Sequence, residues 1–154
     1  MTVSEGVHLE ALTRSRAEEL AEELLAMNVD SDWDDWTRDN LLFDRPGKWD
    51  VSLLATTGGR PVAWAVASWG PEGLHLHHIV VAPDHRSAGI GARMLGELSR
   101  RAAPGTLTLK VHGQNTAAAR FYERLGFTPG ATTPGGYRWY ALEAGQGHDK
   151  GGPG

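Results

Sequence analysis

The 154-residue chain contains no cysteine, which excludes disulfide bonds, thiolate catalysis and zinc sites built on cysteine. It has no apolar run long enough to span a membrane and no signal-peptide pattern, so we expect a cytoplasmic protein without a membrane partner. Excess positive charge is also lacking. The formal net charge of −4 argues against a general nucleic-acid-binding protein.

The composition is that of a globular protein, and six tryptophans are many for one small domain. Aromatic rings with one polar edge suit a ligand pocket. We expect residues 1–143 to form one domain. Residues 144–154 are rich in glycine and lack apolar side chains, so we expect a disordered tail there.

Hydrophobic periodicity predicts an α/β (α+β) domain with a mixed sheet. We expect strands over residues 7–12, 49–56, 61–69, 74–81, 106–111, 127–132 and 137–142. A capping box of Ser15 and Glu18 predicts a helix that runs to about residue 28. A second helix is expected to start near Ser31 or Asp34, a third runs to about residue 102, and Asn115 caps a fourth.

The segment Arg86–Ala92 lies between an expected strand and an expected helix and contains Gly89 and Gly91. Loop N–H groups and a helix N-terminus together favour an anion such as phosphate. A dinucleotide-binding fingerprint would need glycine or alanine where Met94 stands, and a Walker loop would need lysine after Gly96. The alternative is an ordinary turn in which glycine serves packing.

A second motif starts at Asn115, a good helix N-cap, and continues through Phe121-Tyr122 to Gly126-Phe127. Tyr122 follows Asn115 by about two helical turns, so both lie near one face of the helix. With the Arg-x-x-Gly-x-Gly loop, this order resembles the GNAT superfamily of acyl-CoA-dependent N-acetyltransferases. The resemblance implies a single GNAT domain with a mostly antiparallel sheet of six to seven strands, splayed near its centre, and about four helices.

The resemblance also implies that acetyl-CoA is the co-substrate and that no metal is needed. Ile79, Val80 and Val81 would pair with the pantetheine arm, and the Ile79 N–H would stabilise the oxyanion. Asn115 would contact the arm, and Tyr122 would protonate the departing thiolate. The pyrophosphate would be held by Arg86, Ser87, Ala88, Gly89, Ile90, Gly91 and Ala92. Ser87 and Ala88 depart from the glycine and basic residue that the family often has there.

Three histidines lie in the strand before this loop. His75 and His77 are two residues apart and share a face, whereas His78 points the other way unless a bulge re-aims it. An imidazole is suited to take the proton of an attacking amine, so both His75 and His77 are candidate general bases, in no fixed order. The His-Leu-His pattern is similar to the arylalkylamine N-acetyltransferases. Alternatively, the two histidines only fill the sheet face, while a zinc site would need further ligands.

The acceptor site of the family is built from the first two helices and the late hairpin. Here this region contains Asp30, Trp33 and Trp36, with further aspartates nearby, and we place His78 and Trp139 in the same site. Carboxylates beside aromatic rings suit an ammonium group, so we expect a small cationic amine as acceptor. The alternative is that the aspartates cap a helix and the tryptophans cover the sheet.

The resulting hypothesis is transfer of an acetyl group from acetyl-CoA to a primary amine of a small molecule, by direct attack in a ternary complex. A protein or peptide N-acetyltransferase is the second hypothesis, and a non-catalytic acyl-CoA sensor is the third. The sequence leaves open whether the chain forms a homodimer.

Overall fold

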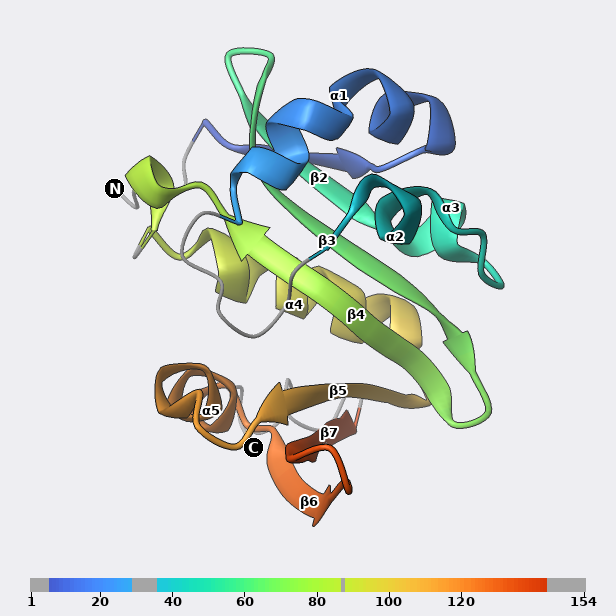
Figure 1. The fold of residues 1–154 in the computed structure, drawn as a ribbon, viewed down its shortest axis with the longest axis vertical. Coiled ribbons are helices and arrows are strands. Elements are labelled where there is room, and N and C mark those ends of the chain that lie inside the picture. The colour runs from blue at the N-terminus through green and yellow to red at the C-terminus, as the bar shows by residue number, and fades with distance from the viewer. Residues whose placement is uncertain (1–5, 29–35, 87, 144–154) are drawn as a thin grey trace.

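The computed structural model describes residues 6–28, 36–86 and 88–143. Its seven strands form a single sheet in the order β1-β2-β3-β4-β5-β7-β6, drawn in Figure 1. Only the pair β4–β5 is parallel, so the sheet is mixed and mostly antiparallel, as expected. The strands are β1 (His8–Ala11), β2 (Leu53–Thr57), β3 (Arg60–Gly70), β4 (Gly73–Val81), β5 (Thr106–His112), β6 (Thr128–Thr132) and β7 (Tyr137–Glu143).

Helices cover both faces of the sheet. The helices are α1 (Arg14–Ala26), α2 (Arg38–Leu42), α3 (Lys48–Val51), α4 (Ile90–Ala102) and α5 (Thr116–Arg124), with a 3-10 turn η1 (Pro83–His85). Helices α1 and α2 pack on one face and α4 on the other, which divides the core into two clusters. Strand β3 is consequently buried along most of its length. Within the described residues, no helix is long and apolar enough to cross a membrane.

Several local predictions from the sequence are confirmed. Gly58 and Gly59 both have positive φ and form the turn of the β2–β3 hairpin. Helix α4 ends at Ala102, and the side chain of Asn115 caps α5 by accepting the backbone N–H of Ala118. Gly126, with φ of 100°, follows the end of α5 in the left-handed conformation that favours glycine.

Two predictions differ from the structure, and a third falls on residues that it does not describe. Thr13 caps α1, not Ser15, because its hydroxyl accepts the N–H of Arg16. The strand expected to start at Trp49 is the helical turn α3 followed by β2, because the chain leaves Gly47 at positive φ and closes a turn through bonds to the Gly47 and Lys48 carbonyls. The helix start near Ser31 or Asp34 lies outside the described residues. The described helix α2 begins after the cap Thr37.

Strands β4 and β5 pair over a short distance and then separate. Their register joins Gly73 to Thr106, Leu74 to Leu107 and His75 to Thr108, and the described pairing ends there. Figure 1 shows the two strands together near their starts and apart at their ends, with α5 beside the end of β5. The expected splay of the sheet is therefore present, and it lies between β4 and β5.

The junction that holds β4 to β5 generates a prediction about Gly73. A Cβ at this position would lie less than 3.0 Å from the backbone oxygen and nitrogen of Thr106, and the φ of Gly73 is 147°. We expect Gly73→Ala to lower the free energy of unfolding by about 1–3 kcal/mol, the range for overpacking a close contact. Urea denaturation measures the change.

The matched control is Gly96→Ala in α4, where a Cβ meets nothing within 4 Å. This substitution should leave stability unchanged or raise it by up to about 1 kcal/mol, because alanine favours a helix over glycine. Equal stability of the Gly73→Ala variant and the wild type would contradict the tight junction.

Candidate active site

A β-bulge in β4 sets the direction of the histidines. The register pairs Val66 with His78 and Ala67 with Leu76, so His77 is the extra residue. The extra residue shifts the alternation, and His75, His77 and His78 all lie on the face that α1 and α2 cover. The apolar neighbours Leu74, Leu76, Ile79 and Val81 point into the core on the α4 side. The sequence analysis expected His78 to share the face of His75 and His77 only if a bulge redirected it, and this bulge is present.

Where β4 and β5 part, the structure has a cleft of about 420 Å³, here called the β4–β5 cleft. One wall is the separated part of β4, including Ile79 and Val80. The opposite wall comes from β5 and α5, and the end of α1 closes one side. The remaining lining residues are Met27, Asn28, His78, Arg86, Lys110, Val111, His112, Asn115, Ala117, Ala118 and Tyr122.

The start of α4 contains the loop that the sequence predicts to bind an anion. Gly89 is the N-cap with φ of 83° and gives no side-chain cap, so the first N–H groups of α4 have no partner within the helix. No acidic residue stands in the first turn, so the positive end of the helix dipole is not neutralised there. A Cβ at Gly91 would lie 3.4 Å from Phe121 and 3.9 Å from Val81, so the first turn of α4 lies beside α5 and the end of β4. Arg86 donates from Nε to the Val81 carbonyl at 3.0 Å and lines the β4–β5 cleft.

Helix α5 brings two predicted residues to the same cleft. Asn115 lines it while its Oδ1 accepts the N–H of Ala118 at 3.3 Å. Tyr122 is 8% exposed and packs among the rings of Phe121, Phe127 and Tyr140. The rings fix the direction of Tyr122, and its position in the lining gives it access to a molecule in the cleft.

His78 borders the β4–β5 cleft and is held on several sides. Its ring stacks on Trp36 at 4.9 Å between centroids and lies against Trp64 at the same distance. Nε2 is 2.9 Å from the Asn28 side-chain oxygen, while Nδ1 is buried without a hydrogen-bond partner among the described atoms. His78 therefore links the end of α1 to β4.

A second cleft, also of about 420 Å³, adjoins the first, since Lys110 lines both. It is here called the histidine cleft, and its described lining is Trp36, Asn40, Arg45, His75, Leu76, His77, Lys110 and Tyr137. The rings of His75 and His77 are 4.8 Å apart. His75 Nδ1 is 2.8 Å from the Thr108 hydroxyl, and His77 Nε2 is 2.7 Å from the Ser68 hydroxyl.

All three histidines are harder to protonate than usual. Burial is the first cause, and it lowers the pKa of His75 to about 4, of His77 to about 3 and of His78 to about 4. The positive charges of Lys110 and Arg45 lower the pKa of His75 further, and both also act on His77 together with its neighbour His75. The imidazoles are consequently neutral at pH 7.

The structure brings together most of the predicted site residues. Ile79, Val80, Arg86, Asn115, Tyr122 and His78 line one cleft, and His75, His77 and Trp36 line the other. Val81 ends β4, and Ala88, Gly89, Ile90, Gly91 and Ala92 form the loop and first turn of α4. Trp139 lies 5.4 Å from His75 and is 38% exposed. Asp30, Trp33 and Ser87 lie outside the described residues.

Three residues that line these clefts were not predicted as site residues from the sequence: Asn28, Arg45 and Lys110. Alternation along residues 106–111 could have placed Lys110 on the face of Thr108. No sequence pattern indicated a functional role for Arg45, because Arg45-Pro46-Gly47 predicts only the end of the preceding helix. Over the described ranges, no cluster of three or more histidines and carboxylates could hold a metal ion.

Comparison with known proteins identifies the family. The Acetyltransferase (GNAT) family profile matches residues 10–127, and the chain belongs to this family. It is 31% identical over 128 residues to N-alpha-acetyltransferase RimI of Mycobacterium tuberculosis, which covers 80% of each protein. It is 34% identical over 91 residues to mycothiol acetyltransferase of Frankia casuarinae, covering 55% of this chain and 26% of that protein. The chain thus spans about a quarter of the latter relative.

Solved structures confirm the fold. The ribosomal-protein-S18-alanine N-acetyltransferase of Escherichia coli superposes with a TM-score of 0.72 at 22% identity, covering 90% of this chain and 94% of the other. The acetyltransferase YncA of Salmonella typhimurium, solved with acetyl-CoA, has a TM-score of 0.67 at 18% identity, covering 91% and 95%. The expected single-domain GNAT fold is therefore confirmed, with five helices, of which α2 and α3 are short.

The lowered histidine pKa values predict how stability depends on pH. In the unfolded chain each imidazole takes up a proton as the pH falls through about 6.5, whereas the folded protein resists protonation until about pH 4. The free energy of unfolding should therefore be highest above pH 6.5 and fall as the pH is lowered toward 4. Urea denaturation at pH 7 and pH 5.5 measures this loss.

The variant His77→Gln removes one of these groups and retains a side chain that can bond to Ser68. The loss of stability between pH 7 and pH 5.5 should be smaller in this variant than in the wild type. Identical losses in both proteins would show that His77 is not held neutral by the fold.

Proposed function

We propose that the protein transfers the acetyl group of acetyl-CoA to a primary amine. The observation that carries this proposal is the opening of the sheet between β4 and β5, with the uncapped N-terminus of α4 close to the end of β4. Family membership supports the same reaction, as does the likeness to a structure that contains acetyl-CoA.

In this proposal, Arg86 and residues Ala88–Ala92 hold the pyrophosphate. The N–H groups of the first turn of α4, which have no acceptor within the helix, would donate to it, and the helix dipole favours its charge. The pantetheine arm lies along Ile79–Val81, where β4 has lost its pairing with β5. Backbone groups on that side can then pair with the amides of the arm. Asn115 and Ala118, at the start of α5, face the arm from the other wall.

The reacting carbonyl lies near Ile79, whose N–H we assign as the donor to the oxyanion. The amine attacks the thioester carbon, the C–N bond forms, and collapse of the tetrahedral intermediate breaks the C–S bond. His75 and His77 remain the candidate acceptors of the amine's proton. Both are neutral at pH 7, so each has a ring nitrogen that can accept a proton, but pKa values of about 4 and 3 make them weaker bases than an ordinary imidazole.

Tyr122 is the proposed general acid that gives its hydroxyl proton to the departing thiolate. Two observations support this role of Tyr122. It lines the β4–β5 cleft, and the surrounding rings restrict its side chain. A non-catalytic acyl-CoA sensor would have no need of this hydroxyl. Release of free thiol with an amine acceptor therefore separates an enzyme from a sensor.

The acceptor is less defined than the acyl donor. The predicted small cationic amine depends on Asp30 and its acidic neighbours, which lie outside the described residues, whereas the described lining of the histidine cleft is positively charged. A protein or peptide N-terminus is the second candidate, favoured by the 31% identity with N-alpha-acetyltransferase RimI. The cytoplasmic location stays a prediction. The tail predicted at residues 144–154 lies outside the described residues.

Replacing Tyr122 by phenylalanine tests the proposed chemistry. The variant keeps the ring and its packing but loses the acidic proton, so kcat should fall by about 10²-fold or more, as for other general acids. The KM for acetyl-CoA should change little. Thiol release with the best acceptor from a panel of primary amines gives both constants.

The matched control is Tyr140→Phe. Tyr140 packs near Tyr122 and its hydroxyl donates to Glu123, but it does not line the β4–β5 cleft. Its loss should leave kcat close to the wild-type value. If Tyr122→Phe retained full turnover, Tyr122 would have no role as the acid.

A further inference from the structure

The described walls of the histidine cleft carry charge of one sign. Arg45 and Lys110 are both in the lining, and none of the described lining residues is a carboxylate. His75 and His77 are neutral at pH 7, so they add no charge of their own to this lining. Burial is the main cause of the low pKa values of His75 and His77, and the two cations lower both values further.

Among the described residues, four arginines form ion pairs with carboxylates. Arg14 binds Asp44 and Glu18, Arg16 binds Glu10 and Glu19, and Glu97 takes both Arg100 and Arg101. Within the described ranges, no ion pair to a carboxylate is found for Arg45 or Lys110. Lys110 instead places its Nζ 5.3 Å from the centre of the Trp139 ring, and Arg45 lies over Phe43 at 5.1 Å.

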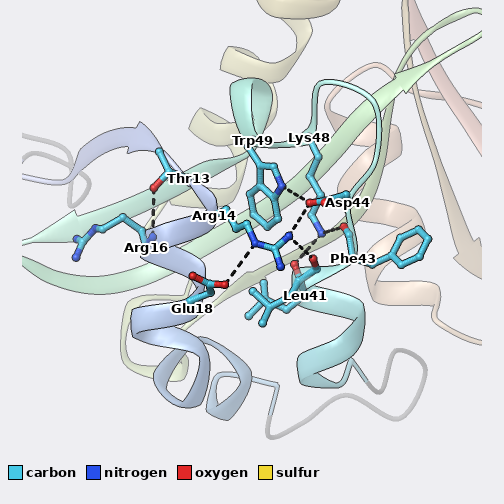
Figure 2. Close-up of polar contacts among 10 residues, drawn as sticks. Thr13, Arg14, Arg16, Glu18, Leu41, Phe43, Asp44, Lys48 and Trp49 are labelled. Carbon is cyan, nitrogen blue, oxygen red and sulfur yellow. Dashed lines mark hydrogen bonds and ion pairs between the residues drawn. The ribbon is translucent and has the colours of Figure 1, made fainter.

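The loop that carries Arg45, residues 43–47, is fastened on three sides. The Lys48 ammonium is fully buried and donates to the carbonyls of Leu41 and Phe43 at 2.7 and 2.5 Å. Asp44 accepts from the Trp49 indole at 2.8 Å and from Arg14 at 2.7 Å, and Figure 2 shows how these side chains enclose the loop.

The far end of the loop is fixed to the sheet. The Trp69 N–H donates to the Pro46 carbonyl at 2.9 Å, and the Trp69 indole lies where a Cβ of Gly47 would stand. Lys110 belongs to a different element, strand β5, and also lines the β4–β5 cleft. Two cations on separately anchored elements thus face one space, a pre-organised arrangement for an anion.

We propose that the acceptor is a small primary amine that also carries an anionic group, a carboxylate or a phosphate, which Arg45 and Lys110 bind in the histidine cleft. Since Lys110 lines both clefts, an acceptor anchored by its anion extends its amine toward the β4–β5 cleft, where Ile79 and Tyr122 lie. This assignment rests on the acetyl transfer proposed above and names the acceptor class for it.

Binding to the CoA-saturated enzyme tests the assignment with probes that differ only in charge. Glycine, β-alanine and 4-aminobutyrate provide carboxylates at three distances from the amine, and 3-aminopropyl phosphate provides a phosphate. In the amide of each amino acid, an uncharged group replaces the carboxylate, and in 1,4-diaminobutane a second ammonium group replaces it. Calorimetry gives affinities, and the ring signals of His75 and His77 in NMR spectra report whether a probe occupies the histidine cleft.

We expect the best acidic amine to bind about tenfold or more tightly than its amide, and the diamine to bind more weakly still. Arg45→Gln and Lys110→Gln should each weaken the acidic probe about tenfold and leave the amide unchanged. Arg60→Gln, an exposed arginine in the β2–β3 hairpin, is the charge-matched control and should have no effect. The stronger of the carboxylate and phosphate probes identifies the anionic group.

Amides or the diamine binding as tightly as the acids would overturn the assignment. So would the absence of binding by every acidic amine, or an acidic peptide that binds where no small acid does. CoA binding and thiol release are measured in the same preparations. If both persist while the acid preference is absent, only the acceptor class fails, whereas a protein that does not bind CoA refutes the acetyl transfer itself.

Discussion

The brief parallel pairing of β4 with β5 is the constraint on which the site depends. Three residue pairs, starting at the close contact between Gly73 and Thr106, hold the two halves of the sheet together. Beyond His75, β4 is paired only with β3 among the described strands, so its other edge presents backbone groups to a cleft. Such groups are costly to leave unsatisfied when buried. A ligand with amide groups of its own can satisfy them, which is how a gap in a sheet becomes a binding site.

The bulge at His77 is the second feature on which the site depends, because it sets the direction of the histidine side chains. One extra residue turns all three histidines to the same face, where burial keeps them neutral. The fixed positive charges in this region are then those of Arg45 and Lys110. The anchored α2–α3 loop carries Arg45 and β5 carries Lys110, and both residues line the histidine cleft. In the proposed acceptor site, these charges would favour an anion, and neutral imidazoles lie nearby.

Local signals in the sequence predicted the parts of the fold that local interactions decide. The Gly58-Gly59 hairpin, the Asn115 cap and the glycine loop before α4 each follow from a few adjacent residues. The turn α3 was missed because its formation depends on bonds and packing around Gly47 and Lys48, and these involve residues distant in sequence. The shared cleft of Arg45 and Lys110 was not predicted for a similar reason. The two residues are 65 positions apart in the sequence, and only the folded sheet brings them to one cleft. The resemblance to the family supplied the topology that local patterns could not.

Hydrogen–deuterium exchange with and without acetyl-CoA tests the central claim most directly, because it reports separately on the open edge of β4 and on the start of α4. If the coenzyme lies along β4 with its pyrophosphate on α4, the amides of residues 79–81 and of the first turn of α4 should both exchange more slowly when it is bound, while those of the β2–β3 hairpin should not change. Saturating acetyl-CoA that leaves both segments unprotected would contradict the account.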